Sequence, residues 1–193
     1  MNSVTTGSLM LELASQGTNF ECKRCGSCCK CTSMIPLTID DIYRVADFLG
    51  MHPDDFFTTY CEEVCCADSA VPMAYLKREK GCPFLADNLC SIHFVKPLLC
   101  RYLPSTIFGS QQYLRAKMPK SCAIQGLRPG TKVNEDDRVR ERYMVSMILT
   151  SIYYSTHGTF VYEHAKPYIY RILLINKNRR HLYDFLEGSR PRN

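Results

Sequence analysis

The sequence predicts an α+β fold: a small cysteine-rich, metal-bound domain with short strands, followed by a C-terminal helical segment. All 12 cysteines lie between Cys22 and Cys122, and five of them fall within the ten residues CKRCGSCCKC. The residues after Cys122 contain no cysteine and repeat apolar side chains at helical spacing. We therefore expect a weakly ordered lead over residues 1–20, a cluster domain over 21–126, and a helical extension packed on it over 127–193.

The segment TIDDIYRVADFLG predicts the first helix of the cluster domain. Thr38 and Asp41 have the spacing of a capping box, in which each side chain accepts a hydrogen bond from the other residue's backbone N–H. Gly50 marks the end of the helix, because glycine readily adopts the left-handed conformation that closes one. Four apolar side chains share one face between these signals: Ile42, Val45, Ala46 and Leu49.

A second helix is predicted to begin at Pro53, since proline suits the first helical turn and two carboxylates follow it. If this helix continues, Cys61 and Cys65 lie four residues apart on one of its faces. The next segment, MAYLKREKGCPFL, alternates loosely and turns at Gly81, which predicts a short strand or a hairpin.

The C-terminal segment has helical periodicity over residues 136–154 and again over 162–176. His157 and Gly158 interrupt it, and Pro167 is expected to flex the second helix. Tyrosines are frequent here, and tyrosine is typically half-buried with its hydroxyl in water. We expect these rings to pack over the cluster domain rather than to line a substrate path.

Composition and charge argue against three classes of protein: disulfide-stabilised secreted domains, membrane proteins and nucleic-acid-binding proteins. Hydrophobic residues make up 46% of the 193 residues, so the chain can build an apolar core without disulfides. The first twenty residues lack the basic start and apolar stretch of a signal peptide, and no apolar stretch approaches the roughly 20 residues that cross a bilayer. The net charge of +5 is spread along the chain, which does not favour nucleic acid. We therefore expect a cytoplasmic protein that binds neither membranes nor nucleic acids.

In a reducing compartment, cysteines at this density are typical of metal ligands rather than of disulfides. Cys22, Cys25 and Cys28 are each separated by two residues, the spacing with which ferredoxin loops bind a [4Fe-4S] cluster. Cys82 precedes Pro83, and a cysteine followed by proline supplies the fourth ligand in such sequences. Zinc sites use the same thiolate pairs, so the spacing favours an iron–sulfur cluster and leaves zinc as the alternative.

The other cysteines divide into two groups. Cys29 directly follows Cys28, and adjacent side chains diverge, so one of these two thiols either serves a second centre or packs as a small apolar group. Eight thiols are enough for two four-ligand sites or for one cluster beside a redox pair: Cys22, Cys25, Cys28, Cys29, Cys82, Cys90, Cys100 and Cys122. The less patterned cysteines are expected to be buried or incidental: Cys31, Cys61, Cys65 and Cys66.

Four segments in this order carry a family resemblance: CKRCGSCCKC, PLTIDDIYRVADFLG, CPFLADNLCSIHFVKPLLCRYLP and SCAIQG. Together, over residues 20–126, they resemble the CxxCxxCC, or YkgJ-like, cysteine-cluster proteins, which are described as zinc- or iron-chelating domains. The resemblance implies that the eight thiols are metal-associated and that Arg101 lies beside the bound group. Two positions depart from the family pattern: His93 stands where tyrosine is commoner, and Lys96 replaces an arginine.

Three functions follow from these observations and from the resemblance. The first is an iron–sulfur protein with an electron-transfer or redox-linked role, working with a protein partner. The second is a zinc-stabilised binding module without catalysis. The third is an enzyme related to flagellin lysine N-methylases, which some members of the family resemble. The sequence has no strand followed by a glycine-rich turn of the methyltransferase kind, so the methylase activity is not assumed for this chain, and whether it is an enzyme stays open.

Overall fold

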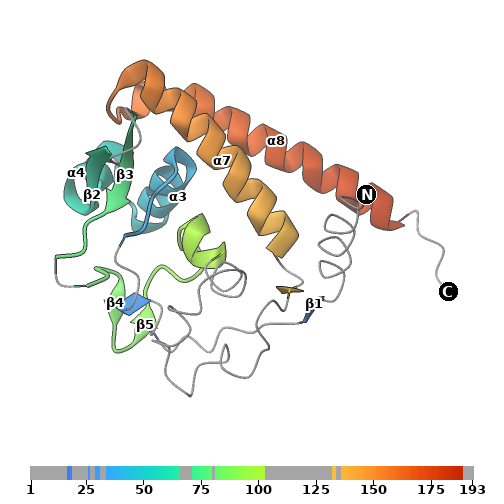
Figure 1. Ribbon diagram of the computed structural model, residues 1–193, viewed down its shortest axis with the longest axis horizontal. Helices are drawn as coiled ribbons and strands as arrows, with labels where there is room; N and C mark the ends of the chain where they lie inside the picture. Colours follow the sequence, from blue (N-terminus) through green and yellow to red (C-terminus); the bar gives the residue numbers. More distant parts are fainter. Residues whose placement is uncertain are drawn as a thin grey trace, which may run out of the picture.

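The computed structural model describes residues 17–18, 26, 29–30, 34–65, 71–79, 81–102, 132–133 and 136–188. Within them, four labelled helices, a short helical segment at residues 98–102 and three two-stranded sheets confirm the predicted α+β fold class (Figure 1). The helices are α3 (Ile39–Leu49), α4 (Pro53–Tyr60), α7 (Asp136–His157) and α8 (Tyr162–Gly188). The strands are β1 (Gly17–Thr18), β2 (Cys61–Cys65), β3 (Pro72–Leu76), β4 (Leu85–Ala86), β5 (Leu89–Cys90) and β6 (Lys132–Val133).

Helix α3 forms with both predicted end signals. The Thr38 hydroxyl accepts from the Asp41 N–H, and the Asp41 carboxylate accepts from the Thr38 N–H, which completes the capping box. Gly50 adopts the left-handed conformation, and its N–H bonds to the last carbonyls of the helix. Helix α4 begins at Pro53 as predicted, with His52 as its N-cap.

Strand β2 replaces the expected continuation of α4. The helix ends at Tyr60, and Cys61 takes an extended conformation at its C-cap. Residues 61–65 then pair antiparallel with β3, in a register that sets Cys61 opposite Leu76. Residues before α3 extend this sheet, because the Leu37 N–H donates to the Ala74 carbonyl at 2.8 Å and the Leu76 N–H donates to the Ile35 carbonyl at 2.9 Å. The helical reading of Cys61 and Cys65 was therefore wrong.

A short hairpin joins β4 to β5 through Asp87 and Asn88, which both have positive φ. Two consecutive left-handed residues make a type I′ turn, and Asp and Asn tolerate that conformation better than most side chains. The two turn residues, Asp87 and Asn88, therefore favour this hairpin without help from distant parts of the chain. Separately, β1 pairs in parallel with β6 and so joins two distant segments of the chain.

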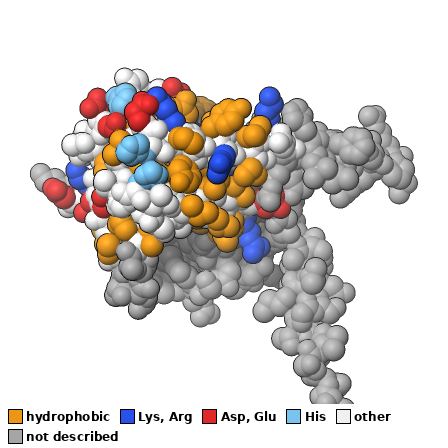
Figure 2. Space-filling view, turned by 90° about the horizontal axis from the view of Figure 1, so that it is seen from above, with side chains coloured by type: hydrophobic (Ala, Val, Ile, Leu, Met, Phe, Trp, Pro, Cys, Tyr) orange, Lys and Arg blue, Asp and Glu red, His pale blue; other side chains and the backbone are white. Residues whose placement is uncertain are grey.

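Helices α7 and α8 run antiparallel along one side of the molecule (Figure 1). Gly158, with φ of +75°, ends the first helix, and the Tyr153 hydroxyl accepts from the Val161 N–H at 2.8 Å. Helix α8 then continues through Pro167. Figure 2 views the outer side of this pair, where hydrophobic side chains gather. Among the described helices, none combines the length and apolar character that crossing a bilayer requires.

Two carboxylates from the cluster domain hold the start of α8. The Phe160 N–H and the Thr159 hydroxyl donate to the Glu63 carboxylate at 2.9 Å and 3.0 Å. The Tyr162 N–H donates to Asp54 at 2.8 Å. Because the first N–H groups of a helix have no partner inside it, Asp54 caps α8 from another part of the chain, while Glu63 holds the two residues that precede Val161.

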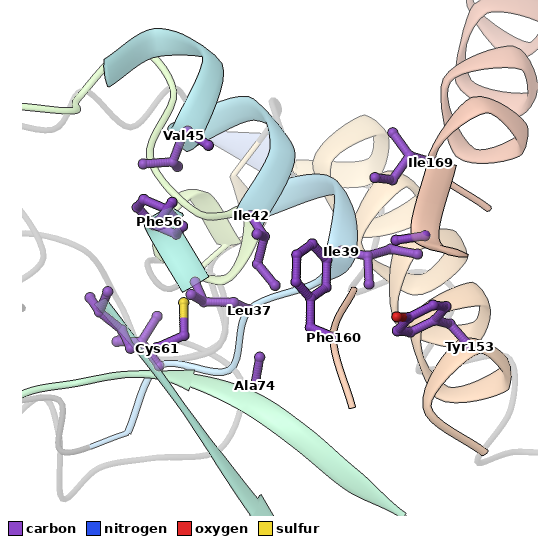
Figure 3. Close-up of a cluster of buried hydrophobic side chains, with 14 of the residues drawn as sticks. Leu37, Ile39, Ile42, Val45, Phe56, Cys61, Ala74, Tyr153, Phe160 and Ile169 are labelled. Atoms are coloured by element: carbon purple, nitrogen blue, oxygen red, sulfur yellow. The ribbon is translucent and has the colours of Figure 1, made fainter. Parts of the chain in front are cut away.

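One apolar core joins the cysteine-rich part of the chain to the C-terminal helices. In Figure 3, side chains from α3, α4, the β2–β3 sheet, α7 and α8 converge on one cluster. The Ile39 N–H, at the first turn of α3, donates to the Thr150 hydroxyl of α7 at 3.1 Å. Core residues that Figure 3 labels are Leu37, Ile39, Ile42, Val45, Phe56, Cys61, Ala74, Tyr153, Phe160 and Ile169.

Candidate metal centre

Of the eight predicted metal-associated cysteines, the structure describes four: Cys29, Cys82, Cys90 and Cys100. Each of these carries a thiol that is partly buried. The other four lie outside the described residues: Cys22, Cys25, Cys28 and Cys122. The eight-ligand set therefore stays a prediction.

Cys82, Cys90 and Cys100 come from three consecutive structural units that pack against the same apolar core. Cys82 begins the turn into β4, and its carbonyl accepts from the Leu85 N–H at 3.1 Å. Cys90 lies in β5 opposite Leu85, and its carbonyl accepts from the His93 N–H at 3.2 Å. Cys100 lies in a helical segment at residues 98–102. Turn, hairpin and helix thus each place one thiol against the apolar core.

The N-terminal cysteine segment contacts this hairpin. The Lys30 N–H, next in the chain to Cys29, donates to the Gly26 carbonyl at 3.1 Å. The Lys30 ammonium donates to the Asn88 side chain at 2.5 Å, and the Arg78 guanidinium donates to the Cys29 carbonyl. The backbone of Gly26 also approaches the Asn88 carbonyl closely. These contacts fix Cys29 beside the hairpin that carries Cys90.

Replacing Gly26 with alanine is expected to break this contact. Gly26 has φ of +71°, and a Cβ there would lie 2.9 Å from the Asn88 carbonyl oxygen and 3.1 Å from Leu85 Cδ1. The left-handed conformation alone costs a non-glycine residue about 1–2 kcal/mol. We expect Gly26→Ala to lower both the metal content of the purified protein and its melting temperature.

Gly50→Ala is the matched control for this variant. Gly50 has φ of +66°, but a Cβ there would meet nothing within 4 Å. It should therefore lose only the about 1–2 kcal/mol that the left-handed conformation costs, and keep its metal. Equal metal contents in the two variants would contradict the role given to the Gly26 contact.

Asp41 positions the helical segment that carries Cys100. Its carboxylate accepts from the Leu98 N–H at 2.9 Å, at the start of residues 98–102. Arg44, which bonds to the same carboxylate at 2.5 Å, also donates to the Val95 carbonyl at 3.2 Å. Helix α3 therefore caps the Cys100 helix from outside. The sequence analysis gave Asp41 only a capping role in its own helix, and no local signal indicated this second one.

The same carboxylates form a buried ionic network. Asp40 and Asp41 are fully buried, and Arg44 bonds to Asp40 at 3.1 Å while Arg142 of α7 bonds to it at 3.0 Å. Burial raises the pKa of the Asp41 carboxyl, and the neighbouring Arg44 guanidinium opposes that shift. Burial lowers the pKa of the Arg44 guanidinium, but the carboxylates of Asp41 and Asp40 raise it by more, so the pKa of Arg44 is raised overall. The network fixes α3 between the Cys100 segment and α7.

Arg101 and His93 lie in the chain between Cys90 and the end of the Cys100 segment. The Arg101 guanidinium donates to the Phe94 carbonyl, so it ties the Cys100 helix to the turn that follows Cys90. The His93 ring meets Phe94 edge-on, with ring centroids 6.3 Å apart. The predicted contact of Arg101 with a bound group stays a prediction.

Cys61 and Cys65, which are not predicted ligands, differ from the described ligand cysteines in their burial. Cys61 is buried in the core, and burial raises the pKa of its thiol to about 12. Cys61 is therefore a core residue, in line with the expectation that the less patterned cysteines are buried or incidental. Cys65, at the end of β2, is exposed.

Within the described residues, no group of three or more His, Cys, Asp and Glu side chains is placed to hold a metal ion. Four of the predicted ligands are outside that part of the chain. The described residues therefore supply a frame for the centre, by which we mean two features. Cys82, Cys90 and Cys100 pack against the core, and hydrogen bonds attach the segment of Cys29 to the rest of the domain.

Comparison with known proteins indicates which kind of ligand the cysteines bind. A family model named CxxCxxCC, described as a "Putative zinc- or iron-chelating domain", matches residues 21–123. The chain is also similar to "Uncharacterized protein MJ0939" of Methanocaldococcus jannaschii, with 30% identity over 99 residues. That match covers 48% of this chain and 32% of the relative, so it spans about a third of the relative's length. No solved structure matches the chain.

Proposed function

The chain belongs to the CxxCxxCC family of zinc- or iron-chelating domains, and from this premise we propose that its cysteine thiolates hold an iron–sulfur cluster, of the [4Fe-4S] type. One observation supports the proposal most: Gly26, Cys29 and Lys30 of the N-terminal cysteine segment contact the hairpin and the strand end next to Cys82 and Cys90. Ligands from segments this far apart in sequence bind one group only when the fold joins those segments.

The described residues fit such a group chemically. Cys82, Cys90 and Cys100 are partly buried against an apolar core, where a thiolate cluster is shielded from water and oxidants. Iron is preferred over zinc because Cys22, Cys25 and Cys28 have ferredoxin-like spacing and Cys82 precedes a proline. The residues that would hold the cluster come from the eight predicted thiols.

The proposed role is one-electron transfer to a protein partner. A [4Fe-4S] cluster supplies reversible exchange of one electron when it is bound. The chain contributes positive charge near the predicted ligands, with Arg101 directly after Cys100 and Lys96 four residues before it. Nearby cations favour the more negative, reduced state and so raise the reduction potential.

A redox titration of protein purified without oxygen tests this role. We expect a one-electron couple that Arg101→Ala shifts to lower potential by up to about 60 mV, a tenfold change in the one-electron equilibrium constant. Arg171→Ala is the control, since Arg171 is an exposed residue of α8, remote in sequence from every cysteine. A metal-loaded protein without any reducible centre would contradict the electron-transfer role.

A zinc-stabilised binding module is the second candidate. The observation that favours it is that the cysteine segments tie the N-terminal loop to a hairpin more than fifty residues away, as Lys30 and Asn88 do. Structural zinc has this stapling role, and its binding free energy becomes folding free energy. A colourless, air-stable protein that unfolds on chelation would support this candidate.

A further inference from the structure

The α7–α8 pair presents an apolar face that nothing in the described structure covers. Along α7, every fourth residue carries a large apolar side chain that is about half exposed: Met144 at 52%, Ile148 at 55% and Ile152 at 48%. Beside them, α8 exposes Tyr170 at 66%, Leu173 at 39% and Leu174 at 43%. We call these six residues the outer face. Figure 2 shows hydrophobic side chains gathered across it.

Helix α7 is apolar on two opposite sides. Its inner side packs Tyr153 and Tyr154 into the core with almost no exposure. The outer face then repeats large apolar residues at a spacing of four, which places them on one stripe. The inner side accounts for the core packing of α7, and contiguous exposed apolar patches such as the outer one mark interaction sites. The outer face also lies beyond residues 21–123, so metal chelation by the family domain does not account for it.

The charges around the outer face differ between its two ends. Exposed Arg140 near the start of α7 and exposed Lys177 on α8 belong to one end, because the helices run antiparallel. The other end, where the helices join, carries Glu163 with Asp54 and Glu63 at the start of α8. Glu163 pairs with Lys166 at 2.5 Å, but its side chain is 67% exposed, so it still carries negative charge at this end. Figure 2 shows Asp and Glu side chains gathered at that end.

We propose that the outer face binds a second copy of this chain, in a symmetric dimer held by four antiparallel helices. A twofold axis across the helix pair sets the basic end of one copy against the acidic end of the other. Ile148, in the middle of the stripe, then lies near its own counterpart on the axis. Closed two-fold pairs are the commonest assembly of soluble proteins, and helices of this kind pack side by side as bundles.

The mass of the protein in solution tests the dimer. By sedimentation equilibrium, the wild-type protein should have twice the 22.2 kDa mass of one chain. Ile148→Glu should sediment as a single chain, with dimerisation at least about a hundredfold weaker, because it brings two like charges together in a buried interface. Ile148 is exposed, so the fold should be kept, and circular dichroism with the metal content checks that.

Phe48→Glu is the matched control, because Phe48 is 46% exposed on α3 and lies outside the outer face. It should remain a dimer. The charge arrangement has its own test: Lys177→Glu should weaken the dimer, and Glu63→Lys is avoided because Glu63 holds Thr159 and Phe160 before α8. Adding Glu163→Lys to Lys177→Glu should restore dimerisation, since it re-creates opposite charges across the interface.

A single-chain mass for the wild-type protein at tens of micromolar would overturn the proposal. So would an Ile148→Glu variant that stays dimeric, or a Phe48→Glu variant that dissociates equally. An Ile148→Glu protein that is monomeric like the wild type but less stable would indicate a segment of the same chain on this face instead. The dimer does not depend on metal identity, so its test stands apart from that of the iron–sulfur proposal.

Discussion

Cys82→Ser should lose most of the bound metal and melt at a temperature lower by at least roughly 5 °C. A serine hydroxyl stays protonated near neutral pH and does not replace a thiolate ligand. Because the predicted ligands come from distant segments, loss of the metal also removes a link between them, and metal-binding free energy is then lost from folding. Elemental analysis and thermal unfolding of the same preparation measure both effects.

Cys65→Ser controls for the loss of any cysteine. Cys65 is exposed at the end of β2 and is not among the predicted ligands. This variant should keep its metal and its melting temperature within error. A Cys82→Ser protein that keeps full metal occupancy and an unchanged melting temperature would remove Cys82 from the ligand set.

Asp41→Ala should have the largest effect on stability of any substitution away from the cysteines, about 3–5 kcal/mol. It removes an acceptor shared by Thr38, Leu98 and Arg44 and leaves a mostly buried guanidinium without one of its carboxylates. It also removes the external cap of the Cys100 segment, so metal affinity should fall with stability. Urea unfolding, with metal content measured on the folded protein, gives both quantities.

Asp47→Ala is the matched control, since Asp47 is an exposed carboxylate on the same helix. Its free energy of unfolding should change by less than about 0.5 kcal/mol. If Asp41→Ala is as mild as this control, then the buried network does not hold the Cys100 segment in place.

Local signals were sufficient for much of the fold. The capping box of Thr38 and Asp41 and the terminal Gly50 predicted the bounds of α3, because each signal satisfies backbone groups within a few residues. Pro53 likewise marked the start of α4, and Gly158 the break before α8. The α+β class followed from the same evidence of spacing, together with the separation of cysteines from the helical tail.

Tertiary contacts decided what local signals could not. Residues 61–65 form a strand because β3 and residues 35–37 supply a sheet edge, which no helical spacing between Cys61 and Cys65 could reveal. Helical and extended conformations both suit so short a stretch, and pairing with distant residues chooses between them.

The candidate ligands could be named from sequence, and they stay a prediction; the contacts that position them could not be predicted. Cysteine spacing and the family resemblance named Cys29, Cys82 and Cys90 from sequence alone, and the family itself is confirmed. The second role of Asp41 joins residues 57 positions apart. The close approach of Gly26 to Asn88 likewise needs the folded chain, because glycine serves equally well where nothing approaches it, as at Gly50.

The metal and acid-labile sulfide contents of protein purified without oxygen, measured with its absorption spectrum, test the central claim most directly. We predict iron with matching sulfide and a broad visible absorption band, as thiolate-bound [4Fe-4S] clusters give. The Cys82→Ser protein prepared in parallel should lose iron, sulfide and absorption together. Zinc without sulfide, in a colourless protein, would contradict the iron–sulfur proposal and make the thiolates a structural zinc site.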